Sequence, residues 1–124
     1  MKANKTGIAR IFAAFSYSAD GIGAAFRHEA AFRQESLLYV LLLPLLYFLP
    51  FTLVFKCLLL AVNTMVLIVE LLNSAIESVV DLVSPDYNIY AKRAKDMGSA
   101  AVLFSLLLAL VLWLAAFADI FFPY

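Results

Sequence analysis

Charged positions divide the chain into segments, and three long uncharged segments predict membrane-spanning helices. Residues 36–55, 57–69 and 97–118 contain no Asp, Glu, Lys or Arg, which gives runs of 20, 13 and 22 residues. A helix needs about 20 apolar residues to cross a bilayer, so the first and third runs are long enough alone. The middle run is long enough when its helix continues past the charge at one end. We therefore expect spanning helices over about 30–49, 52–81 and 91–118.

Residues 1–28 predict a different kind of helix, one that lies on the membrane surface. At 100° per residue, one face about 100° wide collects the apolar side chains Ile8, Ile11, Phe12, Phe15, Ala19, Ile22 and Phe26. The opposite face carries Arg10, Tyr17, Asp20 and Arg27. An amphipathic helix of this kind lies in the headgroup plane with its apolar face toward the hydrocarbon. Taken alone, the segment is equally consistent with a lipid anchor that has no other role.

The composition agrees with an integral membrane protein. Apolar residues make up 65% of the chain and charged residues 15%, against roughly 45–50% and 25% in soluble domains. A soluble protein of 124 residues could not bury so much hydrocarbon. The sequence therefore predicts one all-α membrane domain over residues 1–124. Nine basic and nine acidic residues cancel, so net charge does not indicate a nucleic-acid partner. The single cysteine excludes an internal disulfide and a CxxC motif.

The basic residues predict the orientation of the spans. Eight of the nine lie on one side, before the first span or between the second and third: Lys2, Lys5, Arg10, Arg27, Arg33, Lys92, Arg93 and Lys95. Lys56 is the exception. The positive-inside rule therefore places the N-terminus and the 82–96 loop in the cytoplasm and Tyr124 outside.

Polar side chains on one face of the 52–81 helix predict a functional site. This face carries Asn63, Glu70, Asn73, Ser74, Glu77 and Asp81. Glu70 lies about 27 Å along the helix, which is the cytoplasmic boundary of a bilayer core about 30 Å thick. Interhelical hydrogen bonding accounts for Asn73 but poorly for two carboxylates, since charges in spanning segments are costly. Carboxylates at this depth suit Mg²⁺ with phosphate oxygens, and Lys95, Arg10 and Arg27 could bind a polyphosphate. These features favour a membrane enzyme that handles phosphate.

Three segments resemble those of the prokaryotic diacylglycerol kinases, which are small three-span membrane enzymes. The segments are EAAFRQE at 29–35, ELLNSAIESVVD at 70–81 and RAKDMGSAAV at 93–102. A sister branch of the family phosphorylates undecaprenol, and the 29–35 segment is similar to the diacylglycerol branch. The resemblance implies a homotrimeric helix bundle in the bacterial inner (plasma) membrane. It also implies phosphorylation of diacylglycerol to phosphatidic acid, with ATP as co-substrate, Mg²⁺ as cofactor and sites shared between subunits.

The resemblance also implies roles for individual residues. Glu70 would be the general base, Glu29 and Glu77 would hold Mg²⁺, and Asn73 would orient the base or the acceptor. The nucleotide would contact Arg10, Tyr17, Glu29, Glu77, Asp86, Tyr87, Asn88, Lys95 and Asp96. The family commonly has His where this chain has Asn88, so only backbone contacts carry over there. The acceptor lipid would contact Arg10, Ala14, Phe15, Ser16, Tyr17, Ser18, Ala19, Ala31, Phe32, Arg33, Gln34, Glu35, Glu70, Ser99 and Trp113.

Two alternatives remain open from the sequence. One is an undecaprenol kinase of the same family. The other is a small oligomeric transporter or channel in which Glu70 is an ion or proton site. A channel predicts a polar path to the outer face, but the outer half of the 52–81 helix offers only Asn63 and Thr64. A passive scaffold would leave the carboxylates and Lys95 without a role.

Overall fold

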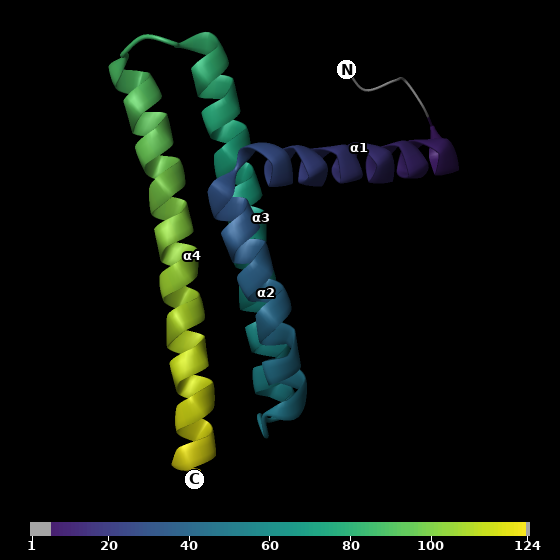
Figure 1. Ribbon diagram of the computed structural model, residues 1–124, viewed down its shortest axis with the longest axis vertical. Helices are drawn as coiled ribbons and strands as arrows, with labels where there is room; N and C mark the ends of the chain where they lie inside the picture. Colours follow the sequence, from purple (N-terminus) through teal and green to yellow (C-terminus); the bar gives the residue numbers. More distant parts are fainter. Residues whose placement is uncertain (1–5, 124) are drawn as a thin grey trace.

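The computed structural model describes residues 6–123, and these form four helices. They are α1 (Gly7–His28), α2 (Ala30–Phe48), α3 (Leu53–Val83) and α4 (Ile89–Phe121). The helices α2, α3 and α4 form an elongated bundle, and α1 projects sideways from it (Figure 1). The central element is α3, which packs against both α2 and α4. Lys2, Lys5 and Tyr124, which entered the orientation argument, lie outside the described residues.

Three of the helices are long and apolar enough to cross a membrane, namely α2, α3 and α4. The all-helical fold with three membrane-spanning helices, predicted from the sequence, is confirmed. With 31 and 33 residues, α3 and α4 are about 46 and 50 Å long at 1.5 Å per residue. A bilayer core is only about 30 Å thick, so parts of both helices lie beyond the hydrocarbon.

A tight corner joins α1 to α2 at Glu29. The guanidinium Nη1 of Arg33 donates a hydrogen bond of 2.6 Å to the backbone oxygen of Phe26, across the corner. The rings of Phe26 and Phe32 meet edge to face, with their centroids 5.2 Å apart. These two contacts hold the start of α2 against the end of α1, which fixes Glu29 between them.

The opposite end of the bundle contains the hydrophobic core. Leu46, Phe51, Leu59 and Ala116 are buried there, from α2, the following turn, α3 and α4. Thr52 caps α3, because its hydroxyl accepts a hydrogen bond of 3.2 Å from the backbone N–H of Phe55. This apolar packing joins all three spanning helices at the end distant from α1.

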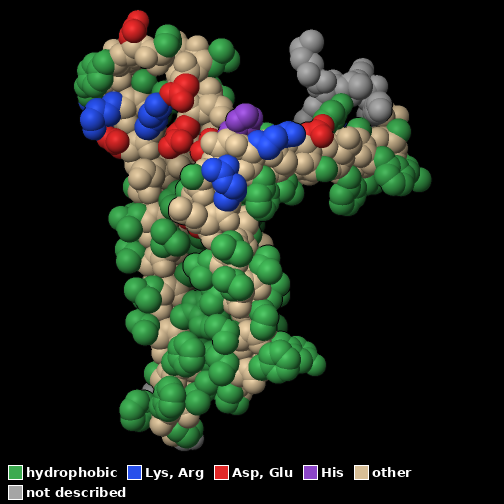
Figure 2. All heavy atoms as spheres, in the orientation of Figure 1, with side chains coloured by type: hydrophobic (Ala, Val, Ile, Leu, Met, Phe, Trp, Pro, Cys, Tyr) green, Lys and Arg blue, Asp and Glu red, His purple; other side chains and the backbone are tan. Residues whose placement is uncertain are grey.

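Charge is distributed unevenly along the bundle. On the face shown in Figure 2, charged side chains gather near the α3–α4 loop and along α1, and the rest of the bundle surface is hydrophobic. Lys56 lies at the other end, where its ammonium group donates a hydrogen bond of 3.2 Å to the backbone oxygen of Tyr47. A broad apolar surface of this kind is suited to contact with lipid acyl chains.

Candidate active site

Four glutamates gather where the charged end of the bundle meets the apolar part. Glu70 of α3 is only 5% exposed. The carboxylates of Glu77 and Glu29 lie close enough to repel the negative charge of Glu70. Glu70 in turn repels the negative charge of Glu35. Glu70 and Glu77 are two turns apart on one face of α3, Glu35 comes from α2, and Glu29 comes from the corner before it. Residues that are distant in sequence therefore contribute carboxylates to one cluster.

Asn73 links this cluster to α4. Its amide Nδ2 donates a hydrogen bond of 3.4 Å to Oε1 of Glu77. Its Oδ1 is directed at Gly98 of α4, so closely that a β-carbon at position 98 would collide with it. Gly98 thus allows α4 to approach α3 with the Asn73 side chain between them.

Three buried side-chain oxygens in this region have no hydrogen-bond partner among the described residues: Glu35 Oε2, Asn73 Oδ1 and Ser74 Oγ. A buried polar group without a partner costs about 1–3 kcal/mol. Such a cost is expected where a ligand supplies the missing partners. The unpartnered oxygens therefore mark this level of the bundle as a candidate binding site.

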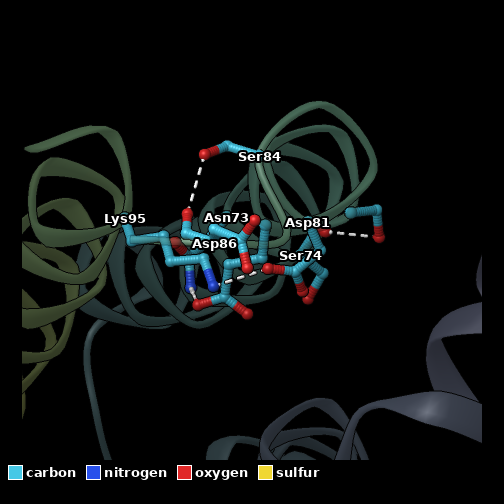
Figure 3. Close-up of polar contacts among 8 residues, drawn as sticks. Asn73, Ser74, Asp81, Ser84, Asp86 and Lys95 are labelled. Carbon is cyan, nitrogen blue, oxygen red and sulfur yellow. Dashed lines mark hydrogen bonds and ion pairs between the residues drawn. The ribbon is translucent and has the colours of Figure 1, made fainter. Parts of the chain in front are cut away.

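A second group of polar residues surrounds a cavity of about 270 Å³ beneath the α3–α4 loop. Lys95 Nζ of α4 lies 2.6 Å from Oδ1 of Asp81 on α3 (Figure 3), and Lys92 Nζ lies 2.6 Å from Oδ2 of Asp96. Exposed ion pairs of this kind stabilise a protein by about 0–1 kcal/mol, so a phosphate group could readily replace either carboxylate.

The loop itself is ordered by two side chains. The hydroxyl of Ser84 donates a hydrogen bond of 2.9 Å to the backbone oxygen of Asp86. Asn88 caps α4, because its Oδ1 accepts hydrogen bonds of 2.8 Å and 3.3 Å from the N–H groups of Tyr90 and Ala91. The structure therefore gives Asn88 a helix-capping role, at the position where the resemblance expects His.

A larger cavity of about 540 Å³ lies between α1 and α3. Most of its lining surface is apolar, and the residues there include Ala25 of α1 and Ala75 of α3. Its polar lining includes Glu29, Ser74 and Ser78. Glu29 also belongs to the carboxylate cluster, so this cavity adjoins the glutamates.

The donor set of the cluster fits a magnesium ion that is shared with a phosphate. No group of three or more His, Cys, Asp and Glu side chains is arranged as a metal site within residues 6–123. Mg²⁺, however, often takes only one or two carboxylates, with waters and phosphate oxygens completing its shell. None of the four glutamates forms an ion pair with a described basic residue. A divalent cation at Glu29 and Glu77 would offset the repulsion that both exert on Glu70.

Comparison with known proteins assigns the family. Residues 16–117 match the family model for prokaryotic diacylglycerol kinase. The chain belongs to this family. It is 44% identical over 113 residues to the diacylglycerol kinase of Escherichia coli K12, which covers 91% of this chain and 93% of the relative. The corresponding enzyme of Pseudomonas aeruginosa is 50% identical over 109 residues, covering 88% and 89%. That of Helicobacter pylori 26695 is 37% identical over 107 residues, covering 86% and 84%.

Within this kinase-family fold, the structure brings some of the predicted site residues together and leaves others apart. Glu29, Glu35, Glu70, Asn73 and Glu77 form the cluster described above. A separate group lines the loop cavity: Asp86, Tyr87, Asn88, Lys95 and Asp96. Ser18 lines the larger cavity.

The remaining predicted contacts lie elsewhere in a single chain. The N-terminal half of α1, which carries Arg10, projects away from the bundle (Figure 1). Several of them are exposed, and Tyr17 is 38% exposed: Ala14, Phe15, Ser16, Ala19, Ala31, Gln34 and Ser99 are the exposed set. Phe32 and Arg33 stabilise the corner. Trp113 donates a hydrogen bond of 3.0 Å from Nε1 to Asn63 Oδ1.

Three residues of this candidate site had no individual role assigned from the sequence. Asp81 pairs with Lys95, Gly98 accommodates Asn73, and Ser74 lines the larger cavity. Helical spacing already placed Ser74 and Asp81 on the face of Glu70. Nothing in the sequence pattern indicated the close contact at Gly98, because it depends on how α4 is rotated against α3.

Proposed function

We propose that the protein transfers the γ-phosphate of Mg·ATP to the free hydroxyl of diacylglycerol, giving phosphatidic acid and ADP. The observation that carries this proposal is the position of Glu70, a buried carboxylate where the charged end of the bundle meets its apolar part. A lipid acceptor remains in the membrane leaflet with its hydroxyl at the interface, which is the depth of Glu70. The names of the relatives, all diacylglycerol kinases, support the choice of acceptor.

In the proposed reaction, Glu70 removes the proton from the acceptor hydroxyl. The hydroxyl oxygen forms a bond to the γ-phosphorus, and the bond from that phosphorus to the bridging oxygen breaks, so that ADP leaves. Asn73 supports this step, because it follows Glu70 by three residues on α3 and its hydrogen bond to Glu77 restrains its side chain on the face that carries the base. Phosphoryl transfer requires positioning and charge stabilisation more than covalent chemistry, and few residues are therefore sufficient.

Glu29 and Glu77 would hold Mg²⁺ together with the phosphates of ATP. The ion would supply charge stabilisation at the transferred phosphoryl group. The loop cavity would take the rest of the nucleotide, with Lys95 and Lys92 available to phosphate oxygens after release from their aspartates. This division places ATP on the loop side of Glu70 and the lipid on the bundle side.

The proposal includes an orientation and an assembly. The N-terminus and the α3–α4 loop would face the cytoplasm of the bacterial inner membrane, since the basic side chains seen in Figure 2 lie at that end. The active form would be a homotrimer. Arg10, an expected nucleotide contact, lies on the half of α1 that projects away from its own bundle. In an oligomer, this part of α1 would lie near a neighbouring subunit's site.

The structure gives little support to the channel alternative. The two polar residues of the outer half of α3 form hydrogen bonds within the bundle. Asn63 accepts from Trp113, and Thr64 shares a hydrogen bond of 3.0 Å with Tyr39. They therefore serve helix packing and do not form a continuous polar path.

The test is transfer of labelled γ-phosphate by the purified protein in mixed micelles. Diacylglycerol and undecaprenol are offered separately, each with Mg²⁺ and with chelator. We expect Mg²⁺-dependent labelling of diacylglycerol. Preferential labelling of undecaprenol would be consistent with the proposed mechanism but would show that the acceptor is undecaprenol and not diacylglycerol. Labelling of neither lipid by folded protein that binds ATP would refute the proposal.

A further inference from the structure

Among the serine hydroxyls that line the cavity between α1 and α3, one lacks a hydrogen-bond partner within residues 6–123. Ser18, Ser74 and Ser78 all line this cavity. The hydroxyl of Ser18 donates to the backbone oxygen of Ala14, and that of Ser78 donates to the backbone oxygen of Ser74, each at 2.9 Å. The Ser74 hydroxyl is buried and has no partner among the described residues. Of the three serines, it is therefore the one whose hydroxyl hydrogen bond is not already made within residues 6–123.

Ser74 lies beside the proposed chemistry. It follows Glu70 by four residues, so the two side chains are neighbours on one face of α3. The residue is 8% exposed, and Figure 3 shows it next to Asn73. Glu29, which belongs to the carboxylate cluster, lines the same cavity. A molecule in the cavity would therefore have Ser74 and the cluster at one end.

The cavity suits the head of a glycerolipid. A volume of about 540 Å³ is within the usual range for small-molecule sites, and most of the lining surface is apolar. It could hold the glycerol group and the first part of the acyl chains, with the remaining chains in the bilayer. Apart from its free hydroxyl, diacylglycerol offers ester carbonyl oxygens, which accept hydrogen bonds. A polyprenol has no carbonyl oxygen.

We propose that the Ser74 hydroxyl donates a hydrogen bond to an ester carbonyl oxygen of the acceptor lipid in this cavity. This inference rests on the proposed function and adds a specificity-determining residue to it. The bond would give the buried donor its missing partner and would hold the free hydroxyl of the lipid toward Glu70. It would also favour an ester lipid over an acceptor without carbonyl groups.

The experiment compares two acceptors that differ only in the carbonyl groups: a diacylglycerol and the dialkylglycerol ether with chains of equal length. Phosphate transfer by the full-length protein is measured in mixed micelles with saturating Mg·ATP. One hydrogen bond stabilises a complex by roughly 0.5–1.5 kcal/mol, so we expect the wild type to prefer the ester between about twofold and about 13-fold in kcat/KM. Ser74→Ala should reduce kcat/KM for the ester to the ether level and leave the ether value unchanged.

Ser78→Ala is the matched control, because it removes a hydroxyl from the same cavity whose donor is already used. This variant should keep the ester preference. Ser74→Thr retains a hydroxyl and should also keep it, which provides a second test should Ser74→Ala fail to fold.

Equal kcat/KM values of the wild type for ester and ether would overturn the inference, and so would an ester preference that survives in Ser74→Ala or is lost in Ser74→Thr. These outcomes leave the diacylglycerol kinase proposal intact. Transfer to undecaprenol but to neither glycerolipid would instead refute the proposed acceptor, and this inference with it.

Discussion

Replacing Gly98 with alanine should impair the enzyme through Asn73. The added β-carbon would collide with Asn73 Oδ1, so the Asn73 side chain or α4 must move. Adding a methyl group to a well-packed contact costs roughly 1–3 kcal/mol. If the whole cost falls on the transition state, kcat decreases between about fivefold and 150-fold. We expect a decrease in this range.

The assay is steady-state phosphate transfer to diacylglycerol, together with thermal unfolding in detergent. Gly23→Ala is the matched control. Its β-carbon would meet only the end of the Arg27 side chain, at an ordinary contact distance of 3.7 Å. Because alanine favours helix over glycine by up to about 1 kcal/mol, this variant should be active and at least as stable as the wild type.

Asn73→Ala separates a local collision from a general effect on helix packing. In that background there is no Oδ1 at the contact, so adding Gly98→Ala should lower the unfolding temperature less than it does in the wild type. Wild-type kcat and stability in Gly98→Ala would refute the reasoning. An equal loss of stability in both backgrounds would also refute it.

Three further predictions concern the metal, the loop and the topology. Glu77→Gln should weaken Mg·ATP binding, measured as a higher Mg²⁺ requirement and a higher KM for ATP, and unchanged values would exclude the metal role. Asn88→Ala should destabilise α4 by about 1 kcal/mol through loss of its cap, seen as a lower unfolding temperature, and Asn88→Asp should retain most of the stability. Equal stability of the two Asn88 variants would contradict the capping role. A reporter fused after Tyr124 should indicate the periplasm, and a cytoplasmic signal would contradict the proposed orientation.

The fold could be predicted because hydrocarbon imposes strict requirements on sequence. Runs without charge identified the spanning helices, and α2 begins and ends within about one residue of the expected limits. In the structure, α3 ends at Val83, two residues after the expected end of the 52–81 helix. The next helix, α4, begins at Ile89, two residues before the expected start of the 91–118 helix. Helix ends are set by local caps such as Thr52 and Asn88, which hydropathy does not detect.

Part of the site could also be predicted, because residues four and seven apart share a helix face. Helical spacing alone places Glu70, Ser74 and Glu77 together on one side of α3. Contacts between helices could not be predicted in the same way. The pairing of Lys95 with Asp81 and the position of Asn73 against Gly98 depend on the rotation of α4 relative to α3. Contacts between subunits could not be predicted from the pattern of residues in one chain.

The central claim, that Glu70 is the base of a lipid kinase, is tested most directly by transfer of labelled γ-phosphate to diacylglycerol with wild type and Glu70→Gln. ATP binding and thermal unfolding are measured on the same samples. The account predicts that Glu70→Gln folds and binds Mg·ATP as the wild type does but transfers no phosphate. Transfer at the wild-type rate by Glu70→Gln would contradict it.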